Sequence, residues 1–241
     1  VCITGLNPLD VYVSMFKGAF GSNRRIWITI RDTMVLLCIS VALAPAFKMK
    51  FWNIGAEGQV LVGGIVTAGI MIYFGEALPT PLLLVIMLGS SIVVGAIWGL
   101  IPAVFKAYFN TNETLFTLMM NYVAIQFTSF FVAKWENPFG SNSVGIINSR
   151  TKSGWFPAIA GQQYLLNVIV VAIITIGIYF YMRKSKQGYE ISVVGESENT
   201  AKYAGINVKW VIIRTMVISG ALCGLAGFIA VSGVDHTIST G

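Results

Sequence analysis

Long uncharged runs constrain the fold of this chain more than any other feature. Residues 114–133 and residues 215–234 each give 20 consecutive residues without a charge, and residues 164–182 give 19. A helix needs about 20 apolar residues to cross the hydrocarbon core of a bilayer. These runs therefore predict transmembrane helices.

Further apolar runs extend this pattern along the chain. Residues 77–105 are uncharged, whereas residues 33–47 and 58–75 are shorter, so each of these two is either a tilted span or a half-helix beside a break. The predicted spans are residues 33–47, 58–75, 79–105, 114–133, 164–182 and 212–234. We expect an all-α fold: one polytopic transmembrane helix bundle with short or broken helices, forming a single transmembrane domain over residues 1–241.

The amino-acid composition indicates which medium, water or lipid, surrounds this bundle. Charged residues are 11% of the chain, against about 25% in soluble domains. The net charge is +6, but the charges flank apolar runs, which is typical of membrane-protein loops. The predicted partner of this surface is therefore a lipid bilayer, and no nucleic acid is expected.

Several chemistries find no support in the sequence. The three cysteines, Cys2, Cys38 and Cys223, have no spacing typical of a metal site. No P-loop motif and no nucleophile–base pair is present, and no ionisable residue lies in the middle of the spans at residues 114–133, 164–182 and 215–234, which we call the secure spans. We expect no catalytic residue, metal or cofactor, and any energy for transport must come from a partner.

The distribution of Lys and Arg predicts an orientation. Residues 183–214 hold six basic residues, which places this loop in the cytoplasm. Counting helices backwards puts residues 134–163 outside and residues 48–57 on the inner side. Residues 7–32, with a basic and aromatic end, are predicted to form an interfacial segment.

Small residues recur on one helix face within the span at residues 79–105. They are Ser91, Gly95, Gly99, Ala103 and Ala107, each four residues apart. Gly220 and Gly224 repeat the spacing in the last span. Such stripes let helix backbones approach closely in membranes, so we expect tight helix packing here.

Polar residues between apolar runs indicate a candidate substrate pathway. Asn53, Glu57 and Gln59 stand with two glycines between the first two predicted spans, and Asn121 lies two turns into a later one. The segment is either an ordinary cytoplasmic turn or a broken helix lining a cavity, with residues 219–233 as its counterpart. We take Asn53, Glu57, Gln59 and Asn121 as candidate pathway residues.

Residues 195–205 read as a short cytoplasmic helix. Ser197 can cap its start, Gly205 can end it, and Ala201, Tyr203 and Ala204 give a small apolar face. So short a helix needs a docking surface, either on this chain or in another subunit. The candidate coupling residues are Glu196, Ser197, Thr200, Ala201, Tyr203, Ala204 and Gly205.

One stretch is specific enough to indicate a family. Residues 53–59 (NIGAEGQ), followed by VLVGG, resemble the signature of bacterial ABC-importer permeases for nucleosides, within the superfamily of ribose, simple-sugar and branched-chain amino acid permeases. Further similar stretches follow in the same order, at residues 7–8 with 17–22, 95–106, 112–122, 194–208 and 218–227. The resemblance covers nearly the whole chain.

The resemblance implies a pore subunit in a bacterial plasma membrane. Such a subunit pairs with a second permease and two cytoplasmic ATPase subunits, and an extracytoplasmic lipoprotein delivers the nucleoside. Residues 195–205 then correspond to the coupling helix that docks in the ATPase. Family members also have a first helix before Asn7 and further helices after Gly241, so we expect this chain to be a fragment.

The sequence thus predicts a permease subunit that forms a pathway for nucleosides and uses ATP hydrolysed by separate subunits. A permease for ribose or another simple sugar is the first alternative. An ion-coupled carrier without an ATPase is the second, disfavoured by the absence of ionisable residues in the secure spans.

Overall fold

The computed structural model describes residues 7–159 and 161–239, and Cys2 lies outside them. Within this part of the chain there is no β-strand, and six helices are long and apolar enough to cross a membrane. These helices are α2 (Asn23–Lys48), α3 (Ala56–Phe74), α4 (Thr80–Phe109), α5 (Glu113–Lys134), α6 (Leu165–Lys184) and α9 (Val208–Ala230). They confirm the predicted all-α, polytopic helix bundle.

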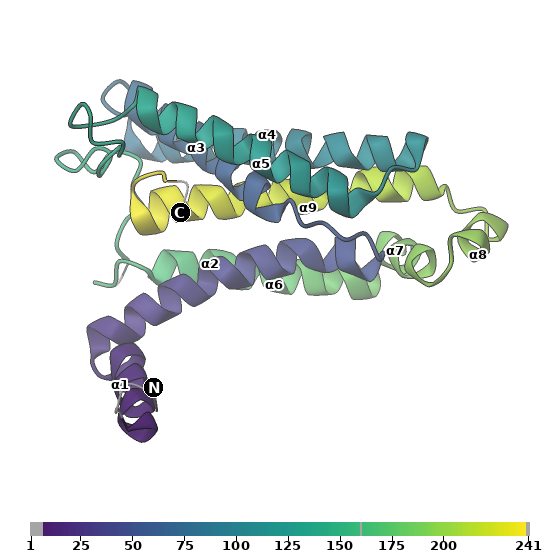
Figure 1. The fold of residues 1–241 in the computed structure, drawn as a ribbon, viewed down its shortest axis with the longest axis horizontal. Helices are drawn as coiled ribbons and strands as arrows, with labels where there is room; N and C mark the ends of the chain where they lie inside the picture. The colour runs from purple at the N-terminus through teal and green to yellow at the C-terminus, as the bar shows by residue number, and fades with distance from the viewer. Residues whose placement is uncertain (1–6, 160, 240–241) are drawn as a thin grey trace.

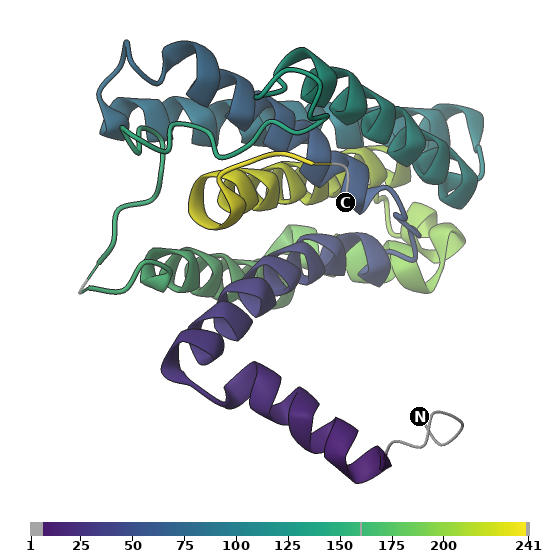
Figure 2. The same ribbon diagram turned by 60° about the vertical axis from the view of Figure 1, so that its left-hand side comes forward.

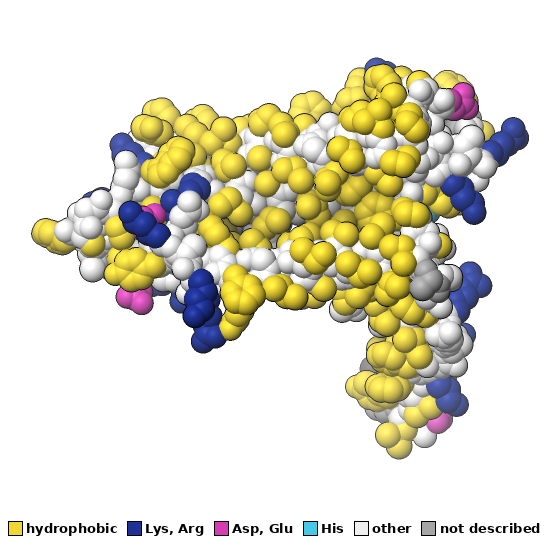
Figure 3. All heavy atoms as spheres, turned by 180° about the vertical axis from the view of Figure 1, so that it is seen from behind, with side chains coloured by type: hydrophobic (Ala, Val, Ile, Leu, Met, Phe, Trp, Pro, Cys, Tyr) yellow, Lys and Arg dark blue, Asp and Glu magenta, His cyan; other side chains and the backbone are white. Residues whose placement is uncertain are grey.

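The six long helices run along one axis of the molecule (Figure 1). Lys and Arg side chains gather toward its two ends and on the N-terminal arm, and apolar side chains cover much of the face between (Figure 3). This banding fits a body whose middle lies in lipid. The structure therefore agrees with a multi-pass membrane protein.

Within the described residues, three shorter α-helices accompany these: α1 (Pro8–Phe20), α7 (Lys186–Glu196) and α8 (Glu198–Tyr203). Helix α1 stands away from the bundle (Figure 2), whereas α7 and α8 lie at the end where α2, α4 and α6 finish (Figure 1). We call this end the α8 end. Which end faces the cytoplasm stays a prediction.

Glycines bring α4 and α9 into backbone contact. A Cβ atom added at Gly95 would lie 2.7 Å from the Cα of Gly224, and one added at Gly99 would lie 2.7 Å from the carbonyl oxygen of Met216. Only residues without larger side chains allow this approach. The close packing predicted from the stripe and from Gly220 and Gly224 is confirmed.

Helix α9 is not the broken counterpart that residues 219–233 suggested. It runs without interruption to Ala230 and continues as a π-helical turn, η2 (Val231–Asp235). The glycines serve contact instead: a Cβ at Gly63 of α3 would lie 2.7 Å from the Cα of Gly224. Glycines in α9 therefore mark close helix contacts, whereas the glycines before α3 lie beside a break between helices.

Helix α2 begins at Asn23, well before the predicted start at Thr33. Ser22 caps it, its Oγ accepting from the Arg25 amide, so the predicted interfacial segment is divided between α1 and the start of α2. The predicted span begins at Thr33 because Arg31 and Asp32 are charged. In the structure these two side chains form an ion pair, with Arg31 Nε 2.8 Å from Asp32 Oδ1. Paired charges near a helix end are tolerated within a span.

The connection between α5 and α6 covers the end opposite α8. The Ile147 amide donates to the His236 carbonyl (2.8 Å), and the Phe156 amide donates to the Ser232 carbonyl (3.1 Å). Trp155 stacks on the buried His236 ring with centroids 3.7 Å apart. We call this connection and its contacts with η2 the cap.

Candidate polar site at the start of α3

The segment that joins α2 to α3, residues 49–55, turns back into the bundle. Helix α3 starts well inside the body rather than at its end (Figure 1). The Ile54 amide donates to Thr117 Oγ1 of α5 (3.2 Å), and the Gly55 amide donates to the Asn53 side-chain oxygen (3.1 Å). We call residues 49–55 the α2–α3 linker. Its course favours the broken-helix interpretation over an ordinary surface turn.

Glu57, in the first turn of α3, reaches helix α5. Its carboxylate accepts a hydrogen bond of 2.9 Å from the Asn121 side-chain amide. Asn121 lies about 12 Å along α5 from the start of that helix, at 1.5 Å per residue. The pair therefore sits deeper in the bundle than the inner-side position expected for residues 48–57.

The candidate pathway residues differ in their exposure. Glu57 is exposed, whereas Asn121 is 7% exposed and Asn53 and Gln59 are each 1% exposed. The Asn53 amide faces the Gln59 side-chain oxygen at 3.4 Å. The structure thus brings all four together, but only Glu57 presents its polar group at the surface.

A glycine makes the contact between α3 and α5 possible. A Cβ atom at Gly58 would come 2.9 Å from the side-chain oxygen of Asn121 and 3.0 Å from the Ala124 methyl group. That Asn121 oxygen is buried and has no hydrogen-bond partner. The close approach holds Asn121 so that its amide group points toward Glu57.

Thr117 of this site, and Lys50 at the other end of the α2–α3 linker, were not singled out from the sequence. Thr117 Oγ1 also donates to the Glu113 carbonyl of its own helix (2.7 Å), a common habit of threonine in helices that gives no sequence signal. Lys50 adopts a left-handed backbone conformation with φ 60°. Only its tertiary surroundings explain that conformation.

The predicted coupling helix forms as α8, but its apolar face is divided. Ser197 Oγ accepts from the Thr200 amide (3.3 Å), and Gly205 ends the helix with φ +74°. Ala201 is completely buried, whereas Tyr203 is 94% exposed. Ala201 therefore packs on this chain, and the exposed residues beyond it are free to meet another surface.

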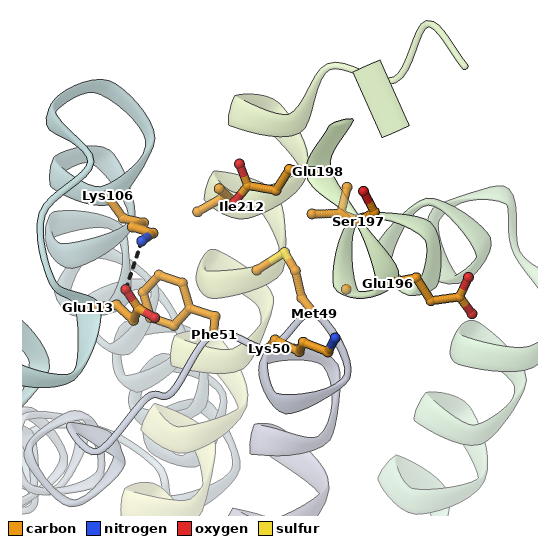
Figure 4. A pocket seen from close by; sticks show the side chains of 11 residues that line it. Met49, Lys50, Phe51, Lys106, Glu113, Glu196, Ser197, Glu198 and Ile212 are labelled. Atoms are coloured by element: carbon orange, nitrogen blue, oxygen red, sulfur yellow. Dashed lines mark ion pairs between the residues drawn. The ribbon is translucent and has the colours of Figure 1, made fainter. Parts of the chain in front are cut away.

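A polar cavity lies between the junction of α7 with α8, the α2–α3 linker, α9 and the adjoining ends of α4 and α5 (Figure 4). The Lys106 ammonium group and the Glu113 carboxylate form an ion pair of 2.8 Å beside it. Its lining includes Met49, Lys50, Lys106, Glu113, Glu196 and Glu198. No group of three or more His, Cys, Asp or Glu side chains that could hold a metal is found in the described residues.

Comparison with known proteins gives one matching family model. The model for the permease component of branched-chain amino acid transport systems matches residues 26–241. No solved structure gives a significant match.

Curated relatives match over most of the chain. The guanosine ABC transporter permease protein NupP of Bacillus subtilis is 31% identical over 93% of the chain. The nucleoside ABC transporter permease protein NupB of Lactococcus lactis is 29% identical over 93%, and the glucose ABC transporter permease protein TsgB13 of Haloferax volcanii is 26% identical over 97%. The chain spans 65%, 64% and 64% of their lengths, respectively. The family match covers most of the chain, from the first turn of α2 onward. This chain belongs to the family of permease components of branched-chain amino acid transport systems.

Proposed function

We propose that this chain is part of a permease subunit that moves nucleosides across a bacterial plasma membrane in an ATP-driven importer. The observation that carries the proposal is the Glu57–Asn121 pair at the interrupted start of α3. The similarity to NupP and NupB supports the choice of nucleosides as substrates.

The chemistry of the pair suits a nucleoside. An ionised carboxylate only accepts hydrogen bonds, and nucleosides offer ribose hydroxyl and base N–H donors. Asn121 fixes one Glu57 oxygen at 2.9 Å, which orients the carboxylate and leaves its other oxygen for substrate. Asn53 and Gln59 are both buried, so they stabilise the linker conformation at the start of α3 instead. We therefore assign the substrate contact to Glu57 and positioning roles to the other three.

The energy source in this proposal is a pair of cytoplasmic ATPase subunits that dock at α8. Tyr203 offers a 94% exposed aromatic side chain, and Glu196, Thr200, Ala204 and Gly205 are exposed beside it. Aromatic residues of this kind are common anchors at protein interfaces. Ser197 caps the start of α8, and the buried Ala201 packs the helix against this chain. A second permease subunit and a substrate-binding lipoprotein complete the proposed importer.

Uptake of radiolabelled guanosine or uridine tests the proposal. The full-length protein is reconstituted in vesicles with its ATPase and binding lipoprotein, as wild type and as Glu57→Gln. Loss of a hydrogen bond to a charged group costs about 1.5–3 kcal/mol, so we expect at least about a tenfold fall in uptake. Glu76→Gln, which alters an exposed carboxylate beyond the other end of α3, serves as the matched control.

The same vesicles separate the alternatives. Uptake of ribose in preference to uridine would identify a sugar permease. Uptake that persists without ATP under an imposed ion gradient would identify an ion-coupled carrier, for which a deep carboxylate such as Glu57 is a suitable relay. Either result contradicts the proposed nucleoside importer.

A further inference from the structure

Helix α7 touches the start of the α2–α3 linker through a glycine. A Cβ atom added at Gly195 would overlap the carbonyl oxygen of Lys48 and lie 3.2 Å from the Cα of Met49. Gly195 is buried and stands two residues before Ser197, the N-cap of α8. Because Gly195 lies in the last turn of α7, which leads directly into α8, a displacement of α8 that carries the end of α7 with it presses on or pulls away from residues 48–49.

The linker itself is held in one shape. Met49, Phe51 and Asn53 are 5%, 3% and 1% exposed, and the Phe51 amide donates to the Ala46 carbonyl (3.0 Å). Lys50 keeps its left-handed conformation between two of these buried anchors. Such conformations persist only where the surroundings fix them, so the linker moves as a unit.

The far end of the linker is fastened to α5 one helical turn from Asn121 of the Glu57–Asn121 pair. Asn53 accepts from the Gly55 amide, and Ile54 donates to Thr117, one turn before Asn121 on α5. The polar cavity beside α8 borders the opposite end of the linker at Met49, Lys50 and Phe51 (Figure 4). This cavity gives the linker space to shift, which a close-packed interior would not.

We propose that the α2–α3 linker transmits movement of α8 to Glu57, and that Gly195 is the positioning residue at which the movement enters the linker. The proposal rests on the proposed function, since it assigns α8 to the ATPase and Glu57 to the substrate. It adds a route between them: Gly195 to the Lys48 and Met49 backbone, then Phe51, then Asn53.

Gly195→Ala tests the route in the reconstituted importer. The added methyl group cannot fit without moving the linker, so we expect the ATPase to stay bound while nucleoside uptake per ATP hydrolysed falls at least about fivefold. Gly177→Ala on α6 is the matched control, because nothing lies within 4 Å of a Cβ there. Uptake per ATP equal to that of the control would overturn the route.

A reversible crosslink gives a second test that does not depend on how the glycine variant folds. Lys50 and Ser197 both line the polar cavity, one on the linker and one at the start of α8. With cysteines at both positions and a reducible bifunctional thiol reagent, we expect uptake to stop while the ATPase stays bound, and to return on reduction. Lys50→Cys alone, treated in the same way, controls for native cysteines.

Crosslinked protein that transports at its uncrosslinked rate would overturn the route. That failure differs from failure of the proposed function, in which the wild-type importer itself shows no ATP-dependent nucleoside uptake.

Discussion

Helices α9 and α6 are similar in hydropathy but lie in very different surroundings. The mean hydropathy of the most apolar window is 2.0 in the span Val208–Asp235, which joins α9 to η2, and 2.3 in α6, yet 72% of that window is buried in the first and 11% in the second. Within lipid, hydropathy does not select the core, because lipid tails are as apolar as leucine. Small residues select it: Gly220 and Gly224 allow α9 to meet α4, whereas Gly177 of α6 meets nothing.

A leucine at Gly220 is the most severe way to break this contrast. Its Cβ would overlap the Gly95 carbonyl oxygen and lie 3.1 Å from the Cα of Gly99, and backbone atoms cannot rotate away. Overpacking costs about 1–3 kcal/mol and more where nothing can yield. We expect Gly220→Leu to lower the yield of folded, monodisperse full-length protein strongly.

Gly177→Leu on α6 is the matched control for that variant, and its yield should equal that of wild type. Equal yields from both variants would show that backbone contact between α4 and α9 is not what holds the core.

A smaller effect concerns a polar contact between α6 and the C-terminal end of α9. The fully buried Asn167 side-chain amide donates to the Gly233 carbonyl of η2 (3.0 Å). Such interhelical hydrogen bonds contribute about 0.6–1.7 kcal/mol in membranes. We expect Asn167→Leu to lower the unfolding free energy in mixed micelles by about 1 kcal/mol.

Thr175→Val provides the comparison on the same helix. Thr175 Oγ1 donates within α6 to the Val171 carbonyl (2.8 Å), so its loss should leave the contact with η2 intact. A loss of stability as large as that of Asn167→Leu would mean that α6 is held by general packing instead.

The smallest expected effect is a pH dependence at the cap. Burial lowers the pKa of His236, with Arg31 acting in the same direction, so the folded protein favours the neutral imidazole. As pH falls below the ordinary histidine pKa of about 6.5, the unfolded chain binds a proton that the folded chain resists. The midpoint temperature of thermal unfolding should therefore fall by a few degrees when the pH is lowered from 7.5 to 5.

His236→Phe isolates this effect, since phenylalanine can still stack on Trp155 but cannot bind a proton. The variant should show a flatter pH profile. An unchanged profile would assign the acid sensitivity to other groups.

Local patterns were predictable from the sequence. Ser197 caps α8, its Oγ accepting from the Thr200 amide (3.3 Å), and the small-residue stripe on α4 meets α9. Both follow from spacing within one helix. Each predicted span overlaps one of the long helices, and the last, residues 212–234, runs on from α9 into η2.

Long-range contacts were not predictable. The depth of Glu57 in the bundle depends on a hydrogen bond between Ile54 and Thr117, which are 63 residues apart. No local sequence pattern predicts this bond. Helix α7 lies within the stretch that the sequence predicts to be a loop. An 11-residue helix is stable only through tertiary packing, here with Ile191 fully buried, and local sequence patterns do not show that packing. The split face of α8 likewise required the position of Ala201 in the folded chain.

Thiol accessibility at position 57 tests most directly whether the start of α3 lies in the substrate pathway. In the reconstituted full-length importer, Glu57→Cys is treated with a water-soluble thiol reagent, with and without nucleoside, and compared with Ile173→Cys on the exposed side of α6. We expect labelling at position 57 that nucleoside slows, and little labelling at position 173. A cysteine at 57 as unreactive as that at 173, or labelled at the same rate with nucleoside present, would contradict a pathway at this site.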